Sequence, residues 1–187
     1  HAGARMDPDV PLPFFNHAIV AVEREDADAL QGAERYELMD PTDENTRDLL
    51  PGYLRNKSFL VAHPEGETLL DSGPSPAGEH LVRISTRGAL DAADRLTLET
   101  EIRFEGVNDN AYRGHFARLK PEERRRFFEG LVRARVAGAA LESFSLAPED
   151  LRDTGQPLVA SLHCAVPDYP LAGKGAWIVD LPWMGGS

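Results

Sequence analysis

The sequence contains a single cysteine, Cys164, among its 187 residues. One thiol excludes an internal disulfide, and it excludes a zinc site built from several thiolates. None of the six histidines stands at the HxxxH or HExxH spacing that places two imidazoles on one side of a helix. We therefore expect neither a bound metal nor a cofactor.

Long hydrophobic runs and an excess of basic side chains are also missing. No stretch of about 18 apolar residues is present, so we expect no insertion into a membrane. Twenty Lys and Arg stand against 31 Asp and Glu, which gives a formal net charge of -11. Phosphate backbones repel such a chain, so nucleic acid is not an expected partner.

The N-terminal residues give little information on the compartment. They lack the basic and apolar regions of a signal peptide, and the chain opens on His1 rather than on Met. We interpret the chain as a segment of a longer parent protein. The sequence does not decide the compartment. For the parent protein we consider the periplasm or the cell envelope.

The chain does contain enough apolar residues for a buried core, since 42% of its residues are hydrophobic. Apolar runs separated by loops rich in Asp, Gly and Pro predict antiparallel strands at 14–22, 36–39 and 58–62. Pro, Gly, Glu and Ser concentrate over 63–78, which is typical of a connection between domains. We place the boundary near residue 75, which gives domains 1–75 and 76–187.

The second domain is predicted to be a sheet with an inserted helical hairpin. Residues 96–104 alternate between apolar and polar, a period of two that buries one face of a strand. Asn108 and Asp109 could cap a first helix, while Pro121 suits the first turn of a second helix that Gly138 would end. Further strands are expected at 141–146, 158–166 and 176–181. The predicted fold class is α+β.

A histidine and an aspartate occupy matching places on the first two predicted strands. His17 opens the first apolar run, and Asp40 ends the second. If the strands pair as a hairpin, alternation puts both side chains on the same face, where the carboxylate could accept the imidazole N–H. This pair would be the base and the orienting acid of a thiol-dependent enzyme. The alternatives are a polar strand end for His17 and turn chemistry for Asp40, because Asp before Pro commonly starts a turn.

Two pairs of segments carry a resemblance to a known family. FNHAIVAVE, at 15–23, and YELMDPTDENTRDLLPGYLRNKSFLV, at 36–61, resemble the His and Asp strands of the transglutaminase-like superfamily of papain-type fold. The segment from 110 to 146 and the segment HCAVPDY resemble the β-rich domain of unknown function that follows this core in large bacterial proteins. In that family a Cys on a helix precedes the His and the Asp. The resemblance therefore assigns the second and third catalytic roles to His17 and Asp40, and the Cys helix has no counterpart here.

This resemblance implies the antiparallel β portion of a transglutaminase-like core, followed by a β-rich domain with a helical hairpin. The parent would be a cysteine peptidase or amide acyl transferase that acts on a peptide or protein substrate. The fragment alone would be inactive, and the surface left without the Cys helix would favour self-association. The competing hypothesis is a non-catalytic binding or scaffold module of a bacterial envelope protein.

Three other features receive structural interpretations. Alternation places Cys164 in an apolar row and His163 on the opposite face, so we expect a buried thiol with a raised pKa rather than a nucleophile. The acidic loop 40–48 lacks the ligand pattern of a calcium site, and we expect it to be solvated. Glutamates flank the arginines at 124–126, which favours ion pairs over phosphate binding.

Overall fold

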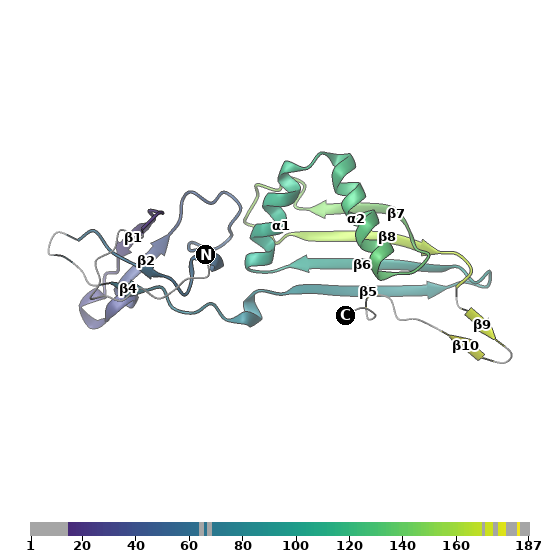
Figure 1. The fold of residues 1–187 in the computed structure, drawn as a ribbon, viewed down its shortest axis with the longest axis horizontal. Helices are drawn as coiled ribbons and strands as arrows, with labels where there is room; N and C mark the ends of the chain where they lie inside the picture. The colour runs from purple at the N-terminus through teal and green to yellow at the C-terminus, as the bar shows by residue number, and fades with distance from the viewer. Residues whose placement is uncertain are drawn as a thin grey trace.

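The computed structural model describes residues 15–63, 66, 69–169, 171–173, 176–178 and 183. Two helices and several antiparallel strands form two groups that follow one another along the chain (Figure 1). The predicted α+β class is confirmed at this level.

The first group consists of two small antiparallel sheets. Strand β1, Val20–Glu23, pairs with β2, Tyr36–Met39, and β3, Ser58–Phe59, pairs with β4, Leu70–Asp71. Their shared core consists of the buried residues Tyr36, Leu38, Leu50 and Leu70. Short 3-10 helices span Ala27–Ala29, Gly32–Arg35, Gly52–Leu54 and, further on, Ala77–Glu79.

Strand β4 corrects the interpretation of 63–78 as a connection. Leu70 is buried and lies opposite Phe59 in the β3–β4 ladder. This part of the stretch therefore belongs to the first group, because its apolar side chain completes that core. The Pro, Gly, Glu and Ser content of 63–78 did not indicate this short strand.

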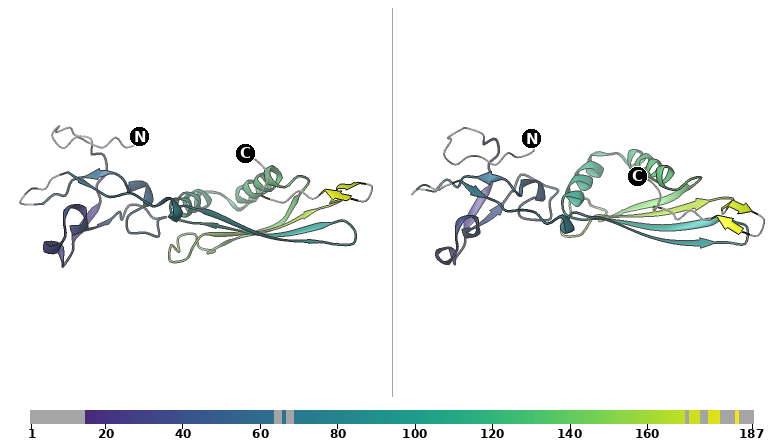
Figure 2. Two further views of the ribbon diagram at one scale, coloured as in Figure 1. Left: turned by 90° about the horizontal axis from the view of Figure 1, so that it is seen from below. Right: turned by 60° about the horizontal axis from the view of Figure 1, so that its bottom comes forward.

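The second group is a four-stranded antiparallel sheet with the order β5-β6-β8-β7. Its strands are β5, Val82–Leu90, β6, Leu96–Phe104, β7, Ala140–Ala147, and β8, Val159–Val166. Helices α1, Val107–Arg118, and α2, Pro121–Arg135, lie in the chain between β6 and β7 and cover one face of the sheet (Figure 2). Two consecutive helices are present where the helical hairpin was predicted, whereas β5 was not expected. Strand β9, Leu171–Gly173, pairs antiparallel with β10, Ala176–Ile178; the remainder of the strand predicted at 176–181 lies outside the described residues.

The core of this sheet confirms the period of two over 96–104. Every second residue of β6, from Leu96 to Phe104, is buried, and the residues between them are exposed. The buried row packs against Phe116 of α1 and against Phe128 and Val132 of α2. Each such apolar side chain contributes about 1.5–3 kcal/mol when it leaves water.

The start of α1 differs from the prediction. The helix begins at Val107 and its N-cap is Gly106, whose φ of 58° suits glycine, so Asn108 and Asp109 do not cap it. Asp109 is buried instead, in an ion pair with Arg113 one turn later. Pro121 is the first residue of α2, as predicted, and Gly138 adopts a φ of 74° shortly after the helix ends at Arg135.

The Asp109–Arg113 pair fastens α1 to the loop between β7 and β8. Arg113 Nε donates to Asp109 Oδ1 at 2.8 Å, and the Arg113 side chain is fully buried. The guanidinium also donates to the backbone carbonyls of Leu151, Asp153 and Gln156, and Asp109 accepts the backbone N–H of Leu158. Both buried charges are therefore satisfied by several hydrogen bonds, as burial requires.

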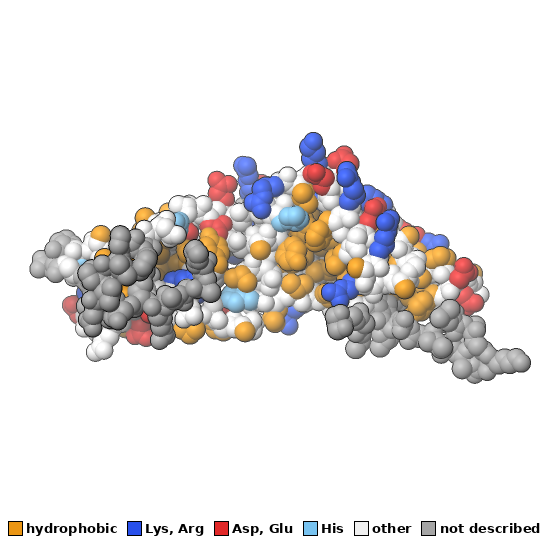
Figure 3. All heavy atoms as spheres, in the orientation of Figure 1, with side chains coloured by type: hydrophobic (Ala, Val, Ile, Leu, Met, Phe, Trp, Pro, Cys, Tyr) orange, Lys and Arg blue, Asp and Glu red, His pale blue; other side chains and the backbone are white. Residues whose placement is uncertain are grey.

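Acidic and basic side chains are interspersed along the helices (Figure 3). Arg125 Nε lies 2.9 Å from Glu129 Oε1, one turn later on α2, and Arg124 Nε donates to the carbonyl of Phe116 at 2.8 Å. The arginines at 124–126 thus include an ion pair of the predicted kind.

Candidate functional site

Strand pairing brings His17 and Asp40 together. Val20 lies opposite Met39 and Ala21 opposite Leu38 in the β1–β2 ladder. Extending the alternation past the ends of the strands carries His17 and Asp40 onto the face of Ala21 and Leu38. His17 Nε2 lies 3.0 Å from Asp40 Oδ2, which is the contact expected from the sequence.

Asp40 is held on both carboxylate oxygens, and its side chain is fully buried. Oδ2 faces His17, while Oδ1 accepts hydrogen bonds from Thr42 Oγ1 at 2.6 Å and from the Thr42 backbone N–H at 3.0 Å. Burial raises the pKa of Asp40, but the hydrogen bonds from Thr42 and His17 outweigh it and leave the pKa below the ordinary value of 3.8. The carboxylate is therefore ionised at neutral pH.

The bonds from Thr42 also bear out the turn interpretation of Asp40. An Asx turn forms when the side chain of an Asp accepts a hydrogen bond from the backbone N–H two residues later. Here Asp40 accepts from Thr42, and Pro41 lies between them. The turn and the contact with His17 coexist because they use different oxygens of one carboxylate. Sequence reasoning did not assign Thr42 to the site, although the Asp-Pro-Thr spacing was a signal for it.

His17 presents its second ring nitrogen away from Asp40. Because a carboxylate only accepts hydrogen bonds, Nε2 carries the proton of the neutral imidazole and Nδ1 carries the lone pair. The side chain of His17 is 40% exposed. Asn16 is exposed too, and no hydrogen bond joins it to His17 or Asp40 within the described residues. A proton donor that approaches from outside could therefore reach Nδ1.

Cys164 lies elsewhere, in the core of the second sheet. It is 2% exposed and lies opposite Leu98 of β6 and Leu141 of β7. Burial raises the pKa of the thiol, and the charge of Glu142 adds to this effect. The prediction of a structural thiol is confirmed, and Cys164 does not serve as the partner of His17.

The loop that follows Asp40 is anchored to the second group. Asp43 Oδ2 accepts hydrogen bonds from Tyr53 Oη at 2.9 Å and from Asn110 Nδ2 of α1 at 2.6 Å. Arg47 Nε donates to the carbonyl of Thr154 at 3.0 Å. The expectation of a solvated acidic loop is therefore wrong for Asp40 and Asp43, because both carboxylates are engaged by the protein.

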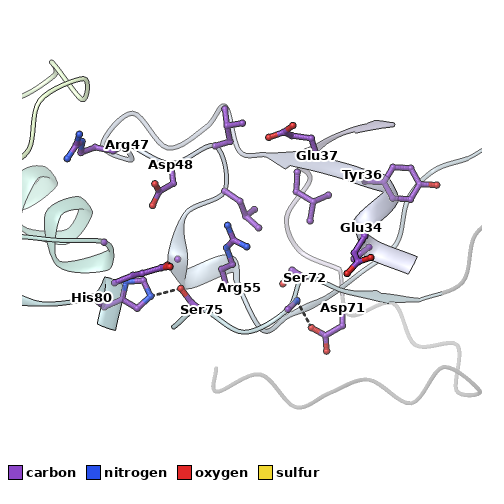
Figure 4. Close-up of a pocket in the computed structure, with 18 of the residues that line it drawn as sticks. Glu34, Tyr36, Glu37, Arg47, Asp48, Arg55, Asp71, Ser72, Ser75 and His80 are labelled. Atoms are coloured by element: carbon purple, nitrogen blue, oxygen red, sulfur yellow. Dashed lines mark hydrogen bonds between the residues drawn. The ribbon is translucent and has the colours of Figure 1, made fainter. Parts of the chain in front are cut away.

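A second imidazole lies at a surface hollow of about 860 Å³ (Figure 4). His80 Nε2 is 2.5 Å from Ser75 Oγ, and the backbone N–H of Val107 donates to Nδ1 at 3.2 Å. Since Nδ1 accepts, Nε2 carries the proton and Ser75 Oγ is the acceptor. This tautomer does not activate the serine, and the pair connects the segment before β5 to the start of α1.

Sequence reasoning missed the Ser75–His80 pair. Glycines on two sides make room for the ring: a Cβ at Gly106 would collide with His80, and a Cβ at Gly52 would lie 2.9 Å from its Cε1. No local pattern marks such an arrangement, because Gly52, His80 and Gly106 are far apart in the sequence.

The described residues offer no group of three or more His, Cys, Asp or Glu side chains that could hold a metal ion. Among the helices of the same part of the chain, none is both long and apolar enough to cross a bilayer. Comparison with family models, curated proteins and solved structures finds no match to the chain.

Proposed function

We propose that His17 and Asp40 are the base and the orienting acid of a transglutaminase-like cysteine peptidase or amide acyl transferase. The nucleophilic thiol would come from a part of the parent protein outside this sequence. The observation that carries the proposal is the 3.0 Å contact between His17 Nε2 and a buried Asp40 carboxylate. A base held from behind by a carboxylate is the arrangement that a Cys-His-Asp enzyme needs.

The chemistry follows from the two ring nitrogens of His17. Nδ1 takes the proton of the incoming thiol while its sulfur bonds to the substrate carbonyl carbon. The imidazolium then gives that proton to the leaving amine, and a thioester remains on the enzyme. Water in hydrolysis, or a second amine in transfer, gives a proton to His17 and bonds to the thioester carbon. The carbon–sulfur bond breaks, and the imidazolium returns the proton to the leaving sulfur.

Asp40 would act through His17 in each of these steps. Its lowered pKa keeps the carboxylate anionic, so it stabilises the imidazolium that forms during acyl transfer. The two bonds from Thr42 fix the direction of the carboxylate, which in turn fixes the tautomer and the plane of the ring. Without the external thiol, we expect the chain alone to be inactive.

The non-catalytic binding module remains the second candidate. The observation that favours it is strand β5, an edge strand of nine residues that are all exposed. A strand of this kind offers its backbone to another chain. The sequence upstream of His1 discriminates between the two candidates, since a helix bearing a Cys favours the enzyme and its absence favours the module.

The test uses the full-length parent protein. Amine incorporation into a glutamine-containing peptide and hydrolysis of that peptide are measured for the wild type and for His17→Ala. We expect a loss of about 100-fold or more, the usual contribution of a general base. The matched control is His163→Ala, because His163 is exposed on a different sheet and should not affect the rate. Unchanged turnover in a folded His17→Ala protein would refute the catalytic role.

A further inference from the structure

Strand β5 is the outer strand of the four-stranded sheet, and only one of its edges is paired. It pairs with β6 over nine residues without a register shift, and no other described strand pairs with it. The backbone groups along its second edge therefore point away from the sheet. Natural edge strands are usually protected by proline, lysine, a bulge or short length. β5 has no proline, lysine or bulge, and at nine residues it is long; its charged side chains are Arg83 and Arg87.

One face of β5 extends the apolar core beyond the cover of the helices. Helix α1 contacts β6 and helix α2 contacts β7. Val82, Ile84 and Leu90 lie opposite Phe104, Ile102 and Leu96, which are buried in the core. The three side chains on β5 are nevertheless 42%, 45% and 43% exposed. The row is thus continuous with the core but is left in water.

β5 is complementary to itself when it is paired antiparallel with full overlap. Thr86 is the middle residue of Val82–Leu90, so it would lie on the two-fold axis. The opposed pairs in this register are Val82 with Leu90, Arg83 with Ala89, Ile84 with Gly88, Ser85 with Arg87, and Thr86 with Thr86.

These pairs fit in size. The large side chain of Ile84 meets a glycine, and Val82 meets Leu90, all on the apolar face. On the polar face no arginine lies directly opposite an arginine, but Arg87 lies diagonally beside Arg83 and Arg87 of the second copy, so charge does not add to the fit. Arg83 is neutralised within its own chain, since its Nε lies 2.9 Å from Glu105 Oε2.

We propose that this chain forms a two-fold symmetric dimer in which β5 pairs antiparallel with β5 of a second copy, in register about Thr86. The two four-stranded sheets become one continuous sheet, and both apolar rows leave water. Nine residue pairs form a small interface beside the roughly 1,600 Å² of a standard stable complex. We therefore expect a dimer whose population depends on concentration.

Sedimentation equilibrium of the 187-residue chain tests the dimer. Between about 1 μM and about 1 mM, the wild-type mass should rise from the 20.5 kDa of one chain toward twice that value. Ile84→Lys places a charge in the apolar row and should keep the mass at that of one chain. The matched control is Leu60→Lys, the same kind of change at a residue that is 52% exposed in the first group, and it should associate like the wild type.

Disulfide trapping tests the register and does not depend on the charged variant. Cross-strand partners bring their Cβ atoms to about 4.5–5.5 Å, so Thr86→Cys should give a disulfide-linked dimer on mild oxidation. Leu90→Cys should not, because Leu90 would lie opposite Val82. The native thiol, Cys164, is buried and should not contribute.

The proposal is overturned by any of three results. These are a wild-type chain that keeps the mass of one chain at about 1 mM, a folded Ile84→Lys protein that associates like the wild type, and trapping that fails at Thr86→Cys or is equally efficient at Leu90→Cys. A wild-type chain that stays monomeric at this concentration because its β5 pairs with a different protein would also overturn the proposal.

Discussion

Thr42 donates two hydrogen bonds to one oxygen of Asp40, from its hydroxyl at 2.6 Å and from its backbone N–H at 3.0 Å. The other oxygen is thereby left to face His17. The hydroxyl matters more than a surface threonine usually does, because the carboxylate it binds is buried and ionised. The orientation of Asp40 is set locally, by a residue two positions away.

Replacing Thr42 should therefore change the titration of Asp40. Thr42→Val keeps the shape but removes the hydroxyl, so we expect the pKa of Asp40 to rise relative to the wild type. The free energy of unfolding should fall by about 1.5–3 kcal/mol, the cost of one charge-assisted hydrogen bond. NMR titration of the Asp40 carboxyl carbon measures the first effect and urea unfolding the second. Thr46→Val, in the same loop but with a hydroxyl that contacts Asp48, should leave the Asp40 titration unchanged.

Stability should depend on pH through Asp40. Its pKa is lower in the folded chain than the 3.8 of the unfolded chain, so its contribution is fully present above that value and is lost as the pH falls through the folded pKa. Asp40→Asn cannot titrate, so the wild type should lose more stability than this variant as the pH is lowered below about 4. Urea unfolding at a series of pH values measures the difference. Parallel pH profiles for the two proteins would contradict the lowered pKa.

Tyr53 should titrate later than an ordinary tyrosine. Partial burial, the hydrogen bond to Asp43 and the charge of that carboxylate raise the pKa of Tyr53 to about 12. Alkaline ultraviolet titration of the four tyrosines should show a late step that disappears in Tyr53→Phe. Asp43→Asn removes the negative charge that opposes phenolate formation, so the late step should move to lower pH. A late step that persists in Tyr53→Phe would assign it to another tyrosine.

The buried pair Asp109–Arg113 should matter far more than the exposed pair on α2. Arg113→Met leaves the Asp109 carboxylate buried without its partner, and we expect a loss of about 3–5 kcal/mol in the free energy of unfolding. Glu129→Gln weakens the exposed pair with Arg125, leaves the hydrogen bond from Arg125 to the carbonyl of Leu141 in place, and should cost less than about 1 kcal/mol. Guanidinium unfolding of both variants makes the comparison. Equal losses would show that burial adds nothing to the first pair.

The parts of the fold that the sequence predicted are those with one buried face. Residues 96–104 follow a strict alternation, and Cys164 lies in the buried row of β8, because helices cover one side of this sheet. The same rule predicted the contact between His17 and Asp40, since pairing of two alternating strands determines which side chains meet. The catalytic role of the pair stays a prediction.

What the sequence did not reveal depends on contacts between distant residues. Strand β5 was missed although Val82 and Ile84 alternate with Arg83 and Ser85, because Thr86, Gly88 and Ala89 interrupt this pattern. Asp109 is a residue type that suits a helix cap as well as an ion pair, and only the position of Gly106 decides between these roles. The Ser75–His80 pair needs Val107 from another element, which no local spacing indicates.

The attachment of the Asp43 loop to α1 has a consequence for dissecting this protein. A truncated protein that ended near residue 75 would keep Asp40 but would lack Asn110 and Thr154, to which Asp43 and Arg47 are bonded. The hydrogen bonds to Asn110 and Thr154 thus hold the loop that carries Asp43 and Arg47 in place. Activity or binding assigned to the first 75 residues has to be measured with the remainder of the chain present.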